Sequence, residues 1–153
     1  MLKTPVTSKF RWIAGAVLML ATAASHAVDF KSVGAAPVIL YDAPSVKGGK
    51  LYVAPRGMPL EVVLSYGEWV KVRDASGEMA WTEAKGLSPK RNVVARTANL
   101  KVRASPDDNA SPVLLVDKGV LLELSEQPTS GWVKVRHKDG QTGYVKTSEV
   151  WGL

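Results

Sequence analysis

Histidine and cysteine carry much of enzyme chemistry, and this chain offers little of either. The 153 residues include no Cys and only two His, His26 and His137. His26 lies in an N-terminal segment that we expect to be removed, so a nucleophile activated by an imidazole would have to use His137. His137 stands beside a predicted hairpin, where a side chain decorates the rim. Paired carboxylates for glycoside cleavage remain open at this point, but the sequence favours a protein that is not an enzyme.

The acidic residues give a similar answer for metal chemistry. The densest acidic cluster is Asp107-Asp108-Asn109, which lacks the alternating oxygen ligands of a calcium-binding loop. A solvated turn is the better interpretation of this segment. Without Cys, neither disulfides nor thiolate metal sites can form. We therefore predict no metal and no cofactor.

Aromatic side chains at repeated positions are the best candidates for binding. Trp69 and Trp132 each precede a loop glycine by eight residues, and Trp81 and Tyr144 each follow that glycine by four. An aromatic ring can stack on a sugar or a peptide, and an arginine can pair with a carboxylate. Each residue also has a structural alternative: Trp packing under a loop, ring packing at one end of a barrel, or a solvated Arg at a strand edge. The candidate ligand-binding residues are Tyr41, Trp69, Trp81, Arg103, Trp132 and Tyr144.

These residues belong to an internal repeat with an offset of 62 to 63 residues. EWVKVRDASGEMAW (68–81) aligns with GWVKVRHKDGQTGY (131–144), and upstream we align 51–53 with 114–116 and Gly57 with Gly119. A short polar join with a proline, 87–91, separates the two copies. The predicted domains are 28–88 and 89–153.

Each copy alternates short apolar runs with turn residues and shows no helical period. In the strand Trp-Val-Lys-Val-Arg, the valines Val70, Val72, Val133 and Val135 should face the core, and the Trp, Lys and Arg should face outward. So many strands in about 60 residues favour a small closed or nearly closed β-barrel. The predicted strands are 30–33, 38–41, 51–53, 60–64, 69–73 and 79–82, then 93–95, 100–103, 113–116, 121–124, 132–136 and 142–146.

The N-terminus has the layout of a secretory signal. Lys3, Lys9 and Arg11 precede an apolar run at 13–24, and small residues follow at 25–27, so we expect a signal peptide at 1–27 with cleavage before Val28. An uncleaved anchor is the alternative, but the run is shorter than the roughly 20 residues of a membrane span. The three cations supply half of the net charge of +6, which leaves a mildly basic chain without the cationic stripe of a nucleic-acid-binding protein. The expected location is extracytoplasmic, in the periplasm.

The repeat resembles the bacterial SH3 domain, a family of extracytoplasmic five-stranded barrels. The segment 100–106 (LKVRASP) is similar to the family's L-N-V-R-x-x-P opening, 131–135 (GWVKV) to its G-W-x-K-V strand, and 139–145 (DGQTGYV) to its closing D-G-x-x-G-Y/W-V. The first copy departs at Glu68 and Ala80, which replace glycines. Both copies lack the Pro and Tyr that line the polyproline groove of eukaryotic SH3 domains.

The resemblance implies an all-β fold of two tandem SH3-like barrels and contact with peptidoglycan peptides, glycans or envelope proteins. We therefore predict an exported, non-catalytic binding protein of the cell envelope that uses peptidoglycan as its ligand. One alternative is a scaffold or accessory protein that docks on an envelope protein. A cryptic wall hydrolase is the second alternative.

Overall fold

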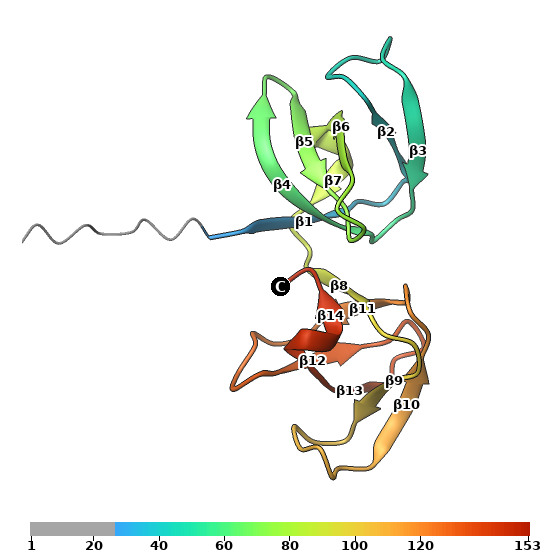
Figure 1. Cartoon of the computed structure of the whole chain (residues 1–153), viewed down its shortest axis with the longest axis vertical. Coiled ribbons are helices and arrows are strands. Elements are labelled where there is room, and N and C mark those ends of the chain that lie inside the picture. The colour runs from blue at the N-terminus through green and yellow to red at the C-terminus, as the bar shows by residue number, and fades with distance from the viewer. Residues whose placement is uncertain (1–26) are drawn as a thin grey trace, which may run out of the picture.

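The computed structural model describes residues 27–153, and the expected signal peptide falls almost entirely outside this range. Two β-sheet units follow one another along the chain (Figure 1). We call β1–β7 barrel 1 and β8–β14 barrel 2. Within residues 27–153, no helix is both long and apolar enough to cross a membrane.

Barrel 1 is a seven-stranded antiparallel sheet with the strand order β3-β2-β6-β5-β4-β1-β7. A single 3-10 turn, η1 (Ala84–Gly86), precedes its last strand. The strands are β1 (Asp29–Val33), β2 (Val38–Tyr41), β3 (Lys50–Ala54), β4 (Pro59–Tyr66), β5 (Trp69–Arg73), β6 (Met79–Glu83) and β7 (Leu87–Ser88).

Barrel 2 repeats the same arrangement, with the order β10-β9-β13-β12-β11-β8-β14. A 3-10 turn, η2 (Thr147–Glu149), again precedes the last strand. The strands are β8 (Asn92–Ala95), β9 (Leu100–Arg103), β10 (Pro112–Val116), β11 (Leu121–Leu124), β12 (Trp132–Arg136), β13 (Thr142–Lys146) and β14 (Val150–Trp151).

The all-β prediction is confirmed, but the barrels are open. In each unit the end strands, β3 with β7 and β10 with β14, are not hydrogen-bonded to each other. The last strand has only two residues, so it is too short to complete a cylinder. Edge strands as short as β7 and β14 also give another chain little to pair with.

Alternation within the strands places the valines inside, as predicted. Val70, Val72, Val133 and Val135 are at most 5% exposed, and each belongs to the apolar core of its own barrel. One detail of the repeat alignment was wrong. Strands β3 and β10 have the same burial pattern, which pairs Leu51 with Val113 and not with Leu114. The offset there is 62, and a one-residue slip matters because it exchanges the two faces of a strand.

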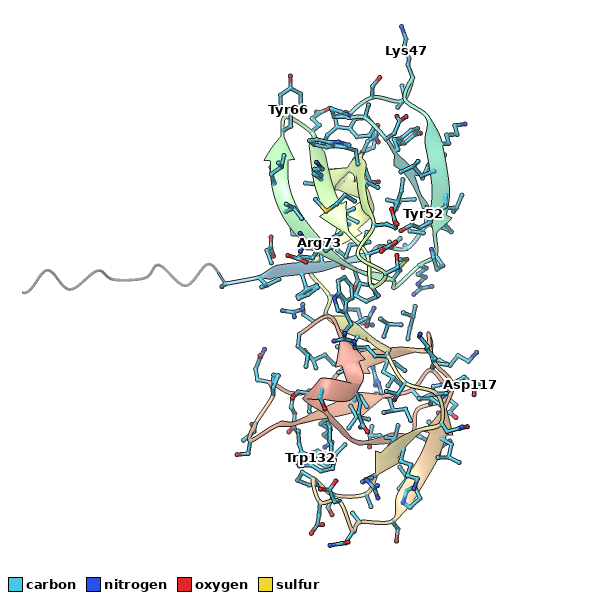
Figure 2. The ribbon with its side chains drawn as sticks, in the orientation of Figure 1. Lys47, Tyr52, Tyr66, Arg73, Asp117 and Trp132 are labelled. Atoms are coloured by element: carbon cyan, nitrogen blue, oxygen red, sulfur yellow. The ribbon has the colours of Figure 1, made fainter. Side chains whose placement is uncertain are left out.

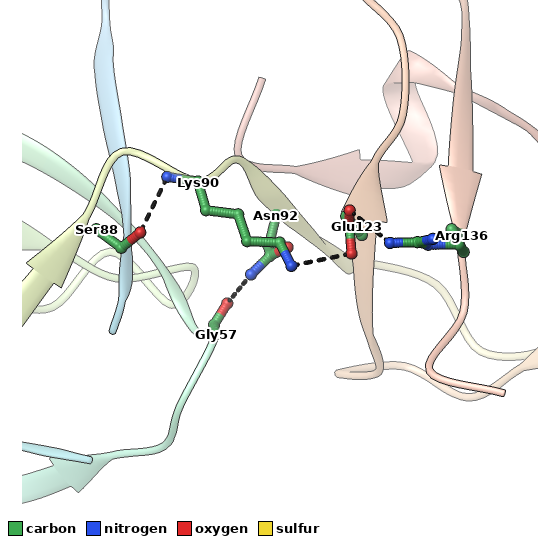
Figure 3. Close-up of polar contacts among 6 residues, drawn as sticks. All are labelled: Gly57, Ser88, Lys90, Asn92, Glu123 and Arg136. Atoms are coloured by element: carbon green, nitrogen blue, oxygen red, sulfur yellow. Dashed lines mark hydrogen bonds and ion pairs between the residues drawn. The ribbon is translucent and has the colours of Figure 1, made fainter. Parts of the chain in front are cut away.

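The two barrels meet at a junction with specific contacts. The Asn92 amide donates a hydrogen bond of 2.9 Å to the carbonyl oxygen of Gly57 (Figure 3). Phe30 of β1 and Trp151 of β14 form an edge-to-face ring pair with centroids 5.0 Å apart. The guanidinium of Arg91 lies 5.5 Å from the centroid of Phe30 and donates to the carbonyl oxygen of Gly152 at 2.8 Å. Trp151 of barrel 2 therefore packs against barrel 1.

Candidate functional site

Barrel 1 presents an aromatic face, which we define as Tyr41, Tyr66, Trp69, Trp81 and Lys71. Strand pairing brings these residues together from β2, β4, β5 and β6: Tyr41 lies opposite Trp81, Tyr66 opposite Trp69, and Lys71 opposite Trp81. All five side chains thus come from the four neighbouring strands β2, β6, β5 and β4. Tyr66 is at the end of barrel 1 that points away from barrel 2 (Figure 2).

The rings of this face form two edge-to-face pairs. The Tyr41 and Trp69 centroids are 5.6 Å apart at an interplanar angle of 79°, and those of Tyr66 and Trp81 are 6.4 Å apart at 75°. The ammonium of Lys71 lies 5.9 Å from the Trp81 centroid. Such pairs hold rings in fixed orientations and stabilise one another by about 0.5–1.5 kcal/mol beyond their burial.

The side chains of the aromatic face differ in how far they are exposed to solvent. Tyr66 is 67% exposed, whereas Tyr41 is only 8% exposed. Trp69 and Trp81 are half-buried. Tyr41, a predicted ligand-binding residue, therefore supports Trp69 from below, and Tyr66 offers the most accessible ring. Sequence reasoning missed Tyr66 because the predicted strand stopped at 64, whereas β4 continues to Tyr66 with its last four residues exposed.

A groove of about 610 Å³ adjoins this face. Its walls come from the β1–β2 segment, from Val46 in the β2–β3 loop and from the region of β6 and η1, and Tyr41 forms part of its lining. Glu83 and Lys85, also in the lining, pair with each other at 2.9 Å. The groove has the size of a small-molecule or short-peptide site.

Barrel 2 builds a different surface on the same strands. Arg103 occupies the position of Tyr41 and donates 2.8 Å to the carbonyl oxygen of Ala110 in its own loop. Lys146 lies 5.8 Å from the Trp132 centroid and 2.6 Å from the Asp108 carboxylate, and Lys134 lies 5.9 Å from the Tyr144 centroid. Within residues 27–153, no aromatic ring pair lies wholly in barrel 2. The second half of the predicted site is therefore a set of single rings with lysine ammonium groups beside them.

Polar contacts in barrel 1 fix the turn between β5 and β6. Asp74 is 7% exposed and accepts hydrogen bonds from the Tyr52 hydroxyl, from the hydroxyl and amide of Ser76, and from the Glu78 amide. Burial opposes ionisation of Asp74, but these hydrogen bonds outweigh it and hold its pKa below the ordinary value. Burial, aided by the Asp74 carboxylate, raises the pKa of Tyr52, so its hydroxyl stays a donor.

His137 occupies the position of Asp74 in barrel 2. Its Nδ1 lies 3.0 Å from the Asp139 carboxylate, and the ring lines a groove at the junction of the barrels. The amide of Gln141, with His137, lowers the pKa of Asp139 to about 2. Within the described range 27–153, no group of three or more His, Cys, Asp or Glu side chains is arranged to hold a metal ion.

Two open barrels with antiparallel strands and a long loop between the second and third strands define a small SH3-like domain repeated in tandem. The sequence profile of the bacterial SH3 domain matches residues 34–89 and 96–152, and the chain belongs to this family.

Solved structures show only distant similarity. NlpC1 from Trichomonas vaginalis has a TM-score of 0.38 and 11% identity, covering 87% of this chain and 49% of that one. An NlpC/P60 family protein from Bacillus cereus has a TM-score of 0.36 and 15% identity, covering 79% of this chain and 55% of that one. The chain thus spans about half the length of these proteins. No curated protein matches it.

Proposed function

We propose that this protein is an exported, non-catalytic binding protein that holds cell-wall peptidoglycan on the aromatic face of barrel 1, in the periplasm. The observation that carries the proposal is the Tyr66–Trp81 ring pair with Lys71 beside it. Glycan rings present C–H faces that stack on aromatic side chains, and stem peptides carry carboxylates that attract an ammonium group. The aromatic face offers both kinds of contact in one place.

The groove next to this face supports the same proposal. A polymer strand needs an extended surface, and the groove continues from Tyr41 along the β1–β2 segment. The exposed side chain of Val46 adds an apolar wall. A glycan on the rings and a peptide in the groove would then be held by one barrel.

Binding to purified sacculi tests the proposal. Tyr66→Ala should weaken retention by about tenfold, because a stacking ring contributes on the order of 1 kcal/mol or more. Tyr144→Ala, at the position of barrel 2 that corresponds to Trp81, is the control and should change retention less than twofold. Tyr66 is exposed, so the variant should melt like the wild type. Equal retention of the two variants, or no retention of the wild type at low salt, would overturn the proposal.

A second candidate function is docking on an envelope protein. The edge strands β3 and β10 each carry two exposed apolar residues, Leu51 and Val53 in one and Val113 and Leu115 in the other. A free sheet edge of this kind can accept a strand from a partner. Crosslinking in envelope extracts distinguishes the two functions, since a scaffold should capture one protein and ignore sacculi. A wall hydrolase, in contrast, should release muropeptides from sacculi, and we expect none.

A further inference from the structure

The contact between the two barrels leaves a second groove, which we call the junction groove. It has a volume of about 620 Å³, and its barrel 1 lining, Arg56 and Gly57, lies in the turn between β3 and β4. Both barrels contribute to its lining. The residues that matter for the argument are Arg56, Asn92, Leu121, Glu123, Arg136 and Lys138.

The charges of the junction groove do not cancel. Glu123 is its carboxylate, and it is already paired with Arg136 at 2.9 Å and with Lys90 at 3.0 Å (Figure 3). Hydrogen bonds from these two cations hold the pKa of Glu123 below its ordinary value. The Glu123 carboxylate therefore stays ionised and paired with them. Arg56 and Lys138 form no ion pair within residues 27–153. The groove therefore keeps unused positive charge for an anion.

The walls of the junction groove are held in place before any ligand arrives. Gly57 has a φ of +82°, and a Cβ there would lie 3.2 Å from the Asn92 amide nitrogen and 3.7 Å from Leu121 Cδ1. Gly119 is the equivalent turn residue of barrel 2, and a Cβ there would meet nothing within 4 Å. The turn after β3 is thus packed against the second barrel. A preformed site loses less entropy on binding.

The floor of the groove adds an apolar contact. Val120 and Leu121 are half-buried and line the groove together with residues of the turn between β12 and β13. A small inorganic anion would use the cations and leave this floor uncovered. A ligand with a negative group and a short apolar side chain would use both.

We infer that the junction groove binds the free carboxylate of a short peptide, with Arg56 and Lys138 on the carboxylate and Leu121 against the apolar side chain. This site shares no residue with the aromatic face and goes beyond the proposed function. A peptide carboxylate can come from a protein C-terminus, built of L-residues, or from a wall stem peptide that ends in D-alanine. The chemistry recognised by the groove is the same in both cases.

Titration of the purified protein with N-acetyl-Ala-Ala, followed by NMR shifts of the Gly57, Gly140 and Asn92 signals, tests this inference. The free acid should shift these signals, and its C-terminal amide should bind at least fivefold more weakly, since charge-assisted hydrogen bonds are about twice as strong as neutral ones. The double variant Arg56→Gln, Lys138→Gln should weaken binding about tenfold.

Lys118→Gln is the matched control, because Lys118 precedes Gly119 as Arg56 precedes Gly57. It should leave binding unchanged. The L,L and D,D forms of the dipeptide distinguish the two sources, and tighter binding of either one supports the site and identifies its ligand. The inference is overturned if neither form binds, if the amide binds equally well, or if inorganic phosphate binds more tightly than the peptide. Loss of peptide binding with intact sacculus retention would separate this site from the aromatic face.

Discussion

The two barrels share the same arrangement of strands and differ in the side chains on their surfaces. Strand order, the inward valines and the positive-φ glycines Gly57 and Gly119 recur in both. The outward residues of the strand Trp-Val-Lys-Val-Arg also recur, but the last residue of β2 has diverged: Tyr41 in barrel 1 corresponds to Arg103 in barrel 2. The comparison teaches that two copies of one fold can carry different surfaces, and the proposed function assigns binding to the aromatic face of barrel 1 alone.

The hairpin turns differ as well. Barrel 1 anchors its β5–β6 turn with a buried carboxylate, that of Asp74, which accepts a hydrogen bond from the hydroxyl of the distant Tyr52. Barrel 2 anchors the equivalent turn with the His137–Asp139 pair, in which Asp139 is exposed. A buried anchor stabilises more and tolerates change less.

The largest predicted effect tests whether the two apolar cores are equivalent in stability. Leu60 and Leu122 occupy matching positions and are 0% and 1% exposed. Leu60→Ala and Leu122→Ala should each lower the free energy of unfolding by about 2–5 kcal/mol, because each leaves a cavity. Urea unfolding measured by NMR signals of each barrel checks this. Leu51→Ala, at an exposed position, should cost less than about 0.5 kcal/mol, and a large asymmetry between the two core variants would contradict that equivalence.

The turn comparison predicts the next largest effect. Asp74→Ala should lower the free energy of unfolding of barrel 1 by about 2–3 kcal/mol, since it leaves the Tyr52 hydroxyl and two backbone amides without their acceptor. Asp139→Ala should have a smaller effect on barrel 2. Both are measured by thermal unfolding at pH 7.

The same turn should make barrel 1 sensitive to acid. The folded-state pKa of Asp74 lies below its ordinary value of 3.8. Its ionised form therefore stabilises the fold above that value, and the contribution is lost as pH falls through the lower, folded-state pKa. Wild type and Asp74→Ala should thus approach each other in stability as the pH falls below 3.8 and through the lower, folded-state pKa. A difference that stays constant from pH 7 to pH 2.5 would show that ionisation of Asp74 is not what stabilises the turn.

The junction tests whether the barrels behave as separate units. Phe30→Ala and Trp151→Ala should show a coupling energy of about 1 kcal/mol in a double-mutant cycle, because their rings form an edge-to-face pair across the junction. The readout is the separation of the two unfolding transitions, which should widen in either variant. A coupling energy near zero would mean that the Phe30–Trp151 ring pair does not join the barrels.

Much of the fold could be predicted because period-two alternation records which residues face the core. The strand Trp-Val-Lys-Val-Arg is an example: its valines are buried in both copies. Openness could not be predicted, since it depends on the two-residue strands β7 and β14 that follow a 3-10 turn. Such short strands leave no periodic signal.

The sequence predicted which types of residue form the candidate site, but it predicted only part of their arrangement in space. Repeated spacing pointed to Trp69 and Trp81, which do lie on one face with Tyr41. Spacing alone ranked the barrel 2 residues as equally good binding candidates. It could not show that the ammonium of Lys146 lies near Trp132 or that Arg103 bonds to its own loop, because these contacts depend on the folded structure. The junction groove left no signal at all, since its residues come from separate turns in two domains.

The smallest predicted effect comes from a substitution in barrel 2, which lacks an aromatic face. Lys146→Ala removes the ammonium beside Trp132 and its pairing with Asp108. It should lower the free energy of unfolding by only about 0.5 kcal/mol, as expected for an exposed cation–π contact, while solvent exchange of the Trp132 indole N–H increases. Sacculus retention should stay unchanged, because barrel 2 has Arg103 in place of Tyr41 and no ring pair of its own within the described residues. A gain in retention would instead identify the lysine, and not the missing rings, as the difference between the two barrels.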